Sequence, residues 1–355
     1  MGAREMGPAM TALTTPRHLE DAGLIDETSV HALDEVASRY AISLTPAMAA
    51  LIDPNDPDDP IARQYLPSVA ELIRLPEERD DPIGDGPHSP VPGVVHRYPD
   101  RVLLKAVHVC PVYCRFCFRR EMVGPSGEGT MSGEDLSRAM AYIAGHPDIW
   151  EVIVTGGDPL ILSPRRLGEL MAALGKVDHV KVIRFHSRVP VTDPDRITVA
   201  LLEALRSSGK TVYVALHANH PTELTSEARF AVDRLIASGV TIVSQSVLLR
   251  GINDDPDVLA ALMRGFVEMR VKPYYLHHPD LAPGTSHFRL SIEEGRAIVS
   301  ALRSKVSGLC MPHYMLDIPG GHGKVPLTES PVSDAADGCY AIEDRLGIMH
   351  HYADI

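Results

Sequence analysis

The strongest constraint on the fold is an alternation of two kinds of segment that begins near Arg97. Short runs rich in β-branched residues alternate with longer segments whose apolar residues recur at helical spacing, and each pair occupies about 30 residues. Parallel strands are joined by long crossovers, usually helices, so this pattern is typical of βαβ units with a parallel sheet. Six such units predict an α/β fold with a partial (βα)6 barrel similar to a TIM barrel.

The pattern also divides the chain. The expected strands span residues 102–109, 151–155, 180–186, 211–217, 241–248 and 272–277. The expected helices span residues 132–144, 165–174, 195–208, 223–237, 256–268 and 292–304. Residues 1–95 contain short amphipathic stretches and segments rich in proline, glycine and aspartate, which predict a mainly helical extension. We expect a barrel domain over 96–328 and a short C-terminal tail over 329–355.

Composition excludes several classes of protein. With 45% hydrophobic and 23% charged residues in 355, the chain is neither disordered nor collagen-like. Its 47 acidic and 34 basic side chains give a formal charge of −13, so we expect no attraction to nucleic acid or anionic lipid. No apolar run approaches the roughly 18 residues needed to span a bilayer, and the first residues lack the apolar region of a signal peptide. We therefore expect a cytoplasmic protein without membrane partners.

Three of the five cysteines fall in one short loop directly after the first expected strand. Cys110, Cys114 and Cys117, in CPVYCRFC, are too few and too crowded for a disulfide framework, and such crowding indicates metal binding. Three thiolates without an obvious fourth would leave one position of an iron–sulfur cluster open. The alternative is a zinc site completed by His96 or His108.

Two glycine-rich segments carry further candidate residues. In VTGGDP, Gly156 and Gly157 end an expected strand beside Asp158, where the absence of Cβ atoms allows close backbone approach and leaves peptide groups for a ligand ammonium. In DIPGGHGK, Lys324 is followed by Val325, so the segment is no Walker A phosphate loop. Lys324 is therefore either a solvated turn residue or an amine that forms a Schiff base with an aldehyde cofactor.

The spacing CxxxCxxC resembles that of the radical SAM superfamily, and the GGD triplet resembles its second motif. Over residues from about 60 to 328, the order of CPVYCRFCFRR, VTGGDP, FHSRVP, NHP, QSVLLRGIND, PYYLHHPDLAPGTSHFR and DIPGGHGK resembles the lysine 2,3-aminomutase family. The resemblance implies a radical SAM barrel with a [4Fe–4S] cluster, S-adenosylmethionine and pyridoxal 5′-phosphate. It also implies an isomerase that converts L-lysine to β-lysine with a 5′-deoxyadenosyl radical, and a one-electron donor such as flavodoxin or ferredoxin.

The resemblance implies a role for each residue that matches a family motif. The implied cluster ligands are Cys110, Cys114 and Cys117. The implied cofactor-binding residues are the catalytic Lys324, which carries pyridoxal phosphate, the phosphate-binding Arg97, Arg101 and Arg188, and also Gly156, Gly157, Asp158 and Gln245. The implied substrate-binding residues are Arg119 for the carboxylate and Asp280 and Asp317 for the ε-ammonium. Two carboxylates match the charge and donors of an ammonium, whereas glutamate-specific relatives should carry basic or neutral residues there.

Some features of the sequence favour a different substrate or a role without catalysis. Phe118 and the wording GGDPL and PYYLH look closer to a branch that modifies a lysine of elongation factor P, although Asp317 matches the free-lysine branch. A zinc-stabilised binding protein, with the glycine loops as plain turns, is the non-enzymatic alternative. Cys310 and Cys339 stand alone and are expected to be packed and unreactive. Since one cysteine follows Lys324, we expect no cysteine-rich zinc segment there, and a homo-oligomer is left open.

Overall fold

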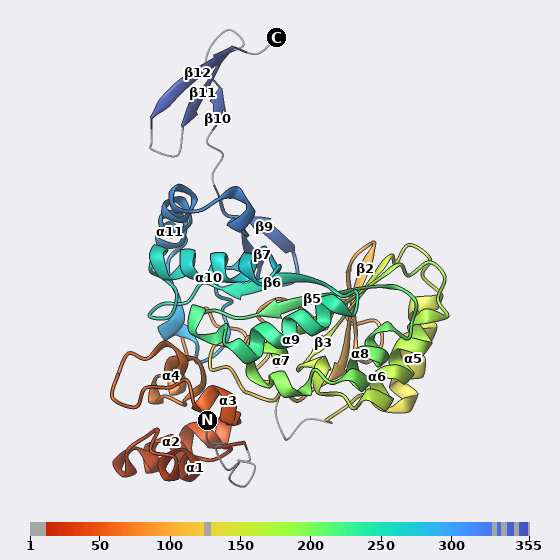
Figure 1. The fold of residues 1–355 in the computed structure, drawn as a ribbon, viewed down its shortest axis with the longest axis horizontal. Coiled ribbons are helices and arrows are strands. Elements are labelled where there is room, and N and C mark those ends of the chain that lie inside the picture. The colour runs from red at the N-terminus through yellow and green to blue at the C-terminus, as the bar shows by residue number, and fades with distance from the viewer. Residues whose placement is uncertain (1–11, 124–128, 329–331, 335–338, 344–347, 354–355) are drawn as a thin grey trace, which may run out of the picture.

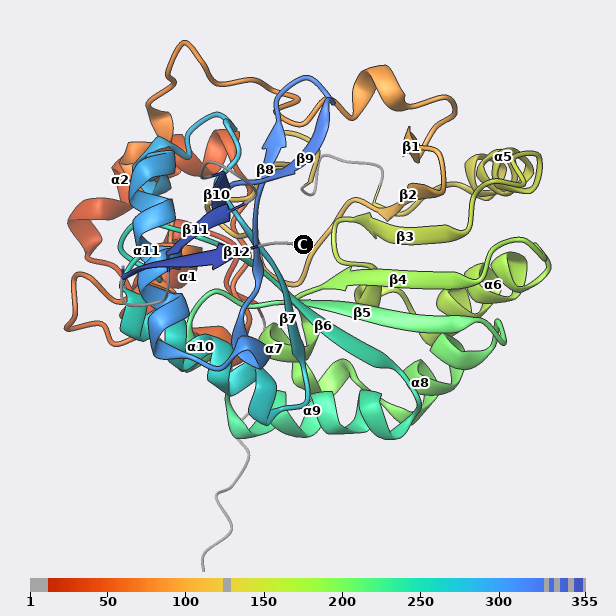
Figure 2. The ribbon, with the colours of Figure 1, turned by 90° about the horizontal axis from the view of Figure 1, so that it is seen from above.

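The computed structural model describes residues 12–123, 129–328, 332–334, 339–343 and 348–353. Its centre is a nine-stranded sheet in the order β1 to β9, curled into a nearly closed barrel (Figure 1, Figure 2). The strands are β1 (Val94–Tyr98), β2 (Arg101–Val107), β3 (Glu151–Gly156), β4 (Val182–Ser187), β5 (Thr211–His217), β6 (Thr241–Val247), β7 (Lys272–His277), β8 (His313–Ile318) and β9 (Gly323–Pro326). Strands β2 to β8 are parallel, and β1 and β9 are antiparallel edges.

Helices cover the outside of the barrel (Figure 2). They are α5 (Gly133–Ala144), α6 (Pro164–Gly175), α7 (Val189–Thr192), α8 (Val199–Arg206), α9 (Ser226–Ala237), α10 (Pro256–Glu268) and α11 (Ile292–Lys305). In α10, for example, the Asp255 side chain caps the N-terminus, and Leu259, Met263 and Phe266 recur at helical spacing on its buried face. Strand interiors such as Val152 and Val154 pack against these faces in one large core.

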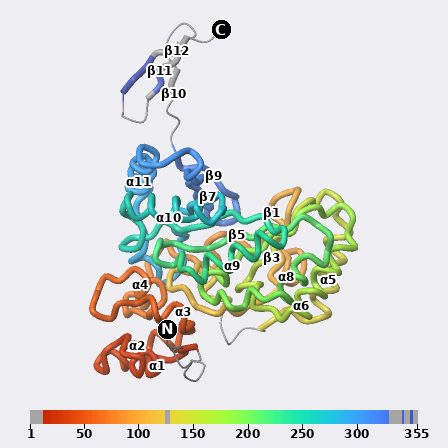
Figure 3. Tube along the Cα trace, in the orientation of Figure 1, coloured from red at the N-terminus to blue at the C-terminus, as the bar shows by residue number. Residues whose placement is uncertain are grey.

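The N-terminal extension is helical, as expected, and lies against one end of the barrel (Figure 3). Its helices are α1 (Pro16–Asp21), α2 (Glu27–Arg39), α3 (Pro46–Ala49) and α4 (Pro60–Tyr65), with single 3-10 turns at Val69–Leu72 and Gly86–His88. Leu19, Leu44, Ile61 and Tyr65 form a second core that also takes in Val112 of the cysteine loop. The extension is thus the surface on which that loop rests.

The barrel is open between its two antiparallel edges, β1 and β9 (Figure 2). The Tyr98 side chain bridges them: its hydroxyl on β1 accepts a hydrogen bond at 2.9 Å from the backbone N–H of Lys324 on β9. A Cβ atom on Gly323 would lie 3.0 Å from the same hydroxyl, so glycine permits this close approach. The bridge places the glycine-rich segment with Lys324 beside β1.

The α/β barrel predicted from the sequence is confirmed, with six βα units followed by a seventh parallel strand, β8, that the sequence pattern did not reveal. The expected helix over 195–208 is a 3-10 turn at Pro194–Arg196 followed by α8, because the Thr198 side chain caps a new helix by accepting from the Leu201 N–H. The division at residue 95 stays a prediction, and β1 begins at Val94.

Beyond the barrel, three short strands form an antiparallel sheet in the predicted tail. These are β10 (Val332–Asp334), β11 (Cys339–Glu343) and β12 (Met349–Ala353). The side chain of Cys339 lies outside the described residues, whereas Cys310 is buried in the barrel core, as expected. None of the helices in the described residues combines the length and the apolarity that crossing a bilayer requires.

Candidate active site

A cavity of about 400 Å³ lies inside the barrel, and every site residue predicted from the sequence lines it. These residues are Cys110, Cys114, Cys117, Arg97, Arg101, Arg119, Gly156, Gly157, Asp158, Arg188, Gln245, Asp280, Asp317 and Lys324. They come from both edges of the sheet and from its middle strands. Barrel curvature therefore gathers residues that are more than 200 positions apart in the sequence around one space.

The cysteine loop is held by the N-terminal extension. The Tyr113 N–H donates to the Ser43 carbonyl at 3.0 Å, and the Arg115 N–H donates to the Gln64 carbonyl at 2.8 Å. The Arg115 guanidinium also forms a buried ion pair with Glu71, with 3.0 Å between Nε and Oε1. Because none of these contacts involves a thiol, the path of the loop is set without using the cysteines.

The three thiols need a cationic partner in order to ionise. Burial raises the pKa of Cys114 to about 11 and also raises the pKa values of Cys110 and Cys117. Arg188 Nη1 donates to Cys114 Sγ at 3.4 Å, and bound metal deprotonates thiols outright. Three thiols lining one cavity suit an iron–sulfur cluster, which is bound by cysteine thiolates.

A single-metal site is not evident in the part of the chain that the structure describes. No three histidine, cysteine, aspartate or glutamate side chains among those residues form a group that could hold a metal ion. His96, one of the two candidate zinc ligands, shares a hydrogen bond of 2.8 Å between Nδ1 and the Tyr142 hydroxyl of α5. That contact turns the His96 ring toward a helix outside the barrel.

Two glycines at the end of β3, Gly156 in the strand and Gly157 directly after it, are required by packing. A Cβ atom on Gly156 would come within 2.2 Å of the Val107 carbonyl, and one on Gly157 within 2.2 Å of the Val109 carbonyl. The N–H of Gly157 donates to Val107 at 2.6 Å, and that of Asp158 to Val109 at 3.1 Å. With these N–H groups engaged, the turn can offer a ligand carbonyl oxygens, the acceptors that an ammonium needs.

Asp158 organises the end of β4. Its buried carboxylate accepts hydrogen bonds from the Ser187 hydroxyl at 2.7 Å and from the N–H groups of Arg188 and Val189 at 2.7 and 3.1 Å. It also caps the turn after β3 by accepting from the Leu160 N–H at 3.0 Å. The geometry thus gives Asp158 a structural task, which is to hold Arg188 beside the cysteine loop.

The three arginines assigned to phosphate are not in equivalent places. Arg188 is buried against Cys114 and forms an ion pair with Glu223. Arg101 stacks on the Tyr98 ring, with 4.0 Å from its guanidinium carbon to the ring centroid. Arg97, on the same strand as Tyr98, donates to a backbone carbonyl, and its buried Nε has no hydrogen-bond partner among the described residues. Arg97 and Arg101 thus lie near each other in the cavity wall, whereas Arg188, directly after β4, contacts the cysteine loop.

Two carboxylates and one ammonium lie together at the ends of β7, β8 and β9. Asp317 pairs with Lys324, its neighbour across the β8–β9 ladder, through Oδ2 and Nζ. Asp317 Oδ1 also lies 3.9 Å from Arg97 Nη1. No hydrogen bond engages the Asp280 carboxylate within the described chain, and burial together with the Asp317 charge raises the pKa of Asp280 to about 7. This corner of the cavity therefore favours a cation.

Arg119 is held on two sides. Its guanidinium donates to Asp85 at 3.1 Å through Nη2 and approaches the Thr155 hydroxyl at 3.4 Å through Nη1. Asp85 also approaches Arg97, with 3.4 Å between Oδ1 and Nη2. Sequence reasoning missed Asp85, because it lies in a polar segment that reads as a loop before the barrel.

Three histidines of the cavity wall were also given no role from the sequence. His186 on β4, His217 on β5 and His277 on β7 each have an Nε2 atom without a hydrogen-bond partner among the described residues. Burial lowers the pKa of His217 to about 3 and lowers those of His186 and His277, so all three are neutral. The repeated placement of histidine at the ends of expected strands was the available signal. Gln245 on β6 is the register partner of His217.

Comparison with known proteins agrees with this geometry. The model for the radical SAM superfamily matches residues 104–263. An L-lysine 2,3-aminomutase from Clostridium subterminale is 39% identical over 313 residues, which cover 88% of this chain and 75% of that protein. The chain belongs to the lysine 2,3-aminomutase family. An L-lysine 2,3-aminomutase from Acetoanaerobium sticklandii is 40% identical over 311 residues, or 88% of this chain and 75% of the relative.

The aminomutase family includes more than one substrate class. A glutamate 2,3-aminomutase from Clostridioides difficile is 36% identical over 295 residues, covering 83% of this chain and 69% of that protein. Membership makes this protein a radical SAM isomerase, and the cofactors of the family are a [4Fe–4S] cluster, S-adenosylmethionine and pyridoxal phosphate. The interpretation as a zinc-stabilised binding protein is therefore wrong.

Proposed function

We propose that this aminomutase interconverts L-lysine and β-lysine. The observation that carries the proposal is the pair Asp280 and Asp317 on one side of the cavity, with Arg119 also in its wall. Two carboxylates satisfy the charge and the three donors of an ε-ammonium, and a guanidinium fork pairs with the substrate carboxylate. A glutamate side chain at the same place would bring a third carboxylate next to Asp280 and Asp317, which charge repulsion disfavours.

The remaining cavity residues fit the cofactors. Cys110, Cys114 and Cys117 would hold the cluster, and Lys324 offers the amine to which pyridoxal phosphate attaches. The unpartnered Nε of Arg97, together with Arg101, suits a phosphate. When bound, the cluster and S-adenosylmethionine supply the radical that removes hydrogen from carbon, and pyridoxal phosphate supplies the carrier for the migrating nitrogen.

Protein groups do the positioning. Arg119 at one end of the substrate and the two aspartates at the other would fix the carbon chain between them, so that one hydrogen faces the cysteine side of the cavity. Gly156 and Gly157 carbonyls and the Gln245 amide are the groups we assign to S-adenosylmethionine. We assign Asp158 and Arg188 to the support of the cysteine loop, with Arg188 facing Cys114. Electrons would come from a donor such as flavodoxin or ferredoxin.

Replacing Lys324 tests the cofactor assignment. We expect Lys324→Ala to lose turnover and covalent attachment of pyridoxal phosphate, because the structure offers that amine to the cavity, while iron content and affinity for S-adenosylmethionine stay at wild-type levels. Borohydride reduction followed by peptide mapping measures the attachment. Coenzyme trapped at another lysine in the wild-type protein would contradict the assignment.

Substrate competition tests the substrate class. Reconstituted enzyme is incubated with L-lysine, L-glutamate or folded elongation factor P, and the β-amino products are quantified. We expect the enzyme to turn over L-lysine and neither of the other two substrates. In the Asp280→Asn variant, lysine turnover should fall by about 10- to 150-fold, since a lost hydrogen bond to a charged group is worth about 1.5–3 kcal/mol. Preferential modification of elongation factor P or of glutamate would overturn the proposal.

A further inference from the structure

A short loop of the N-terminal extension, residues 81–88, holds one carboxylate against two arginines of the cavity. The Asp81 side chain accepts hydrogen bonds from the N–H groups of Asp85 and Gly86 at 2.8 and 2.7 Å, which fixes the backbone around Asp85. The loop packs tightly on the glycine-rich segment before Lys324, since a Cβ atom on Gly84 would lie 2.4 Å from the Gly321 nitrogen. The loop thus touches the element that carries the proposed coenzyme lysine.

The Asp85 carboxylate lies between two arginines of the cavity and is only 2% exposed. Its Oδ2 atom accepts from Arg119 Nη2 at 3.1 Å, and its Oδ1 atom lies 3.4 Å from Arg97 Nη2. Arg119 is also held by the Thr155 hydroxyl, and Arg97 by the Ile83 carbonyl at 2.6 Å. Each guanidinium is therefore fixed from the side of the extension while it lines the cavity.

The charges favour an ionised Asp85. Burial opposes ionisation, yet the Arg119 guanidinium, with the Lys105 ammonium and the Arg97 guanidinium, outweighs it and lowers the pKa of Asp85. Asp85 by itself does not neutralise these three cations, although Asp317 also lies 3.9 Å from Arg97. Arg119 and Arg97 can therefore still attract further anions, and the substrate carboxylate and the coenzyme phosphate are the anions that the proposed function requires.

We propose that Asp85 is a positioning residue that orients Arg119 toward the substrate carboxylate and Arg97 toward the phosphate of pyridoxal phosphate. This inference rests on the proposed function, because it assumes the anions that those arginines bind. One carboxylate shared by both arginines fixes the spacing between the two anions, and hence the distance from the coenzyme to the substrate. A misplacement of about 1 Å costs about 100-fold in rate when reacting groups must be aligned.

Steady-state kinetics of Asp85→Asn in the reconstituted holoenzyme test this inference. We expect KM for L-lysine and the dissociation constant of pyridoxal phosphate to rise about tenfold or more, since hydrogen bonds to charged groups contribute about 1.5–3 kcal/mol. The Asp85→Glu variant keeps the charge and should recover part of both losses. KM does not depend on the fraction of molecules that fold, so a variant that is only less stable would keep the wild-type KM.

Asp80→Asn is the matched control. Asp80 lies in the same segment, and its exposed carboxylate pairs with Arg74 at 2.9 Å, away from the cavity. We expect it to match wild type in KM, coenzyme affinity and iron content. A wild-type KM for lysine in Asp85→Asn overturns the inference. Absence of β-lysine from the wild-type enzyme overturns the proposed function instead, while the coenzyme titration of Asp85→Asn still tests the placement of Arg97.

Discussion

At the scale of single residues, Asp280 has the most strongly altered chemistry of the proposed substrate site. Burial and the neighbouring Asp317 charge raise its pKa to about 7, so the carboxyl is neutral in acid and ionised above neutrality. The substrate ammonium needs the ionised form. Burial disfavours ionisation of the Asp280 carboxyl in the free enzyme. The same low-dielectric surroundings strengthen the attraction between the ionised carboxylate and a cation that enters the cavity.

We therefore expect kcat/KM for L-lysine to rise with pH across an apparent pKa near 7, because kcat/KM reports ionisations of the free enzyme. The raised pKa means that the competent form is lost as pH falls, not as pH rises. Initial rates between about pH 6 and pH 8 at saturating S-adenosylmethionine measure the effect. In the Asp280→Asn variant, kcat/KM should be low and should not rise with pH near 7. The same rise in that variant would assign the ionisation to another group.

At the scale of elements, the sequence predicted most of the barrel and the residues that we assign to the cluster, the cofactors and the substrate, but not the positioning residue Asp85. Six parallel strands were expected because their β-branched runs are short and bounded by turns. Strand β8 was missed because HYMLDI is brief and mixes polar with apolar residues, although it carries Asp317. The helix expected at 223 begins at Ser226, since Thr225 caps it and Glu223 is used in an ion pair with Arg188.

Spatial pairing between segments could not be predicted in the same way. The order of the motifs predicted that the cysteines, Lys324 and the two aspartates lie at strand ends. In the structure, closure of the barrel brings these residues to one cavity. Asp85 acquires its surroundings from segments far away in the chain, so no local pattern marks it. The three neutral histidines end expected strands, but only barrel closure brings them to one cavity. The expectation that Arg188 binds phosphate with Arg97 and Arg101 came from motif matching alone and stays a prediction. In the structure, Arg188 contacts Cys114 and Glu223.

The packing of β3 against the chain after β2 predicts the effect of a methyl group. In Gly157→Ala, the new Cβ would lie 2.2 Å from the Val109 carbonyl, so the segment that leads into Cys110 must move. We expect reconstituted iron per chain to fall by more than half while the far-ultraviolet spectrum stays unchanged. Gly133→Ala, at the start of α5 with no atom within 4 Å of the added Cβ, should bind full iron. Full iron in Gly157→Ala would show that the loop tolerates the shift.

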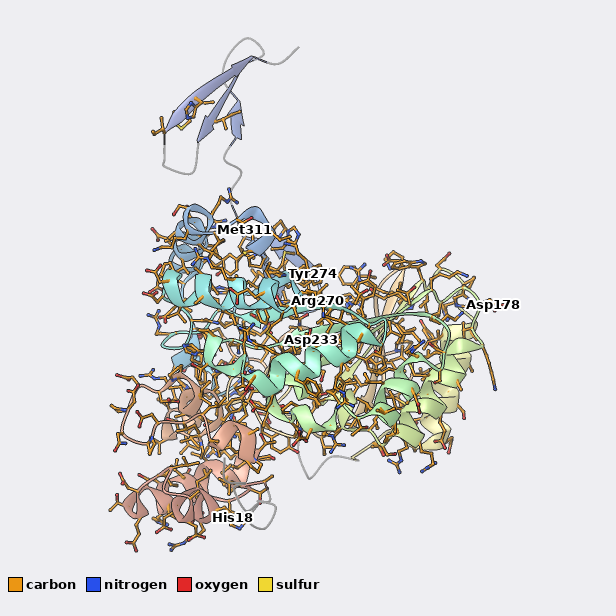
Figure 4. All side chains as sticks on the ribbon, viewed as in Figure 1. His18, Asp178, Asp233, Arg270, Tyr274 and Met311 are labelled. Atoms are coloured by element: carbon orange, nitrogen blue, oxygen red, sulfur yellow. The ribbon has the colours of Figure 1, made fainter. Side chains whose placement is uncertain are left out.

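At the scale of the whole molecule, the N-terminal extension and the barrel share buried ionic clusters. Glu71 of the extension pairs with both Arg115 and Arg120 of the cysteine loop, and it is only 1% exposed. Gln64 of α4 joins Arg188 and Glu223 in a second buried cluster. Contacts on the surface are of another kind: the Arg270–Asp233 pair that joins α9 to the segment before β7 is exposed to solvent (Figure 4).

Because of these shared clusters, we expect the N-terminal extension and the cysteine loop to unfold locally as one unit. Removing one partner of a buried ion pair lowers the stability of the folded protein by about 3–5 kcal/mol, whereas an exposed ion pair contributes about 0–1 kcal/mol to it. We expect Glu71→Gln to lower the free energy of unfolding in urea by about 3 kcal/mol or more, and Asp233→Asn to change it little. In hydrogen–deuterium exchange, Glu71→Gln should speed exchange of α4 and of residues 110–120 by the same factor, with α8 unaffected. Faster exchange in α4 alone would mean that the extension opens independently, and the cysteine loop would then owe its shape to the barrel.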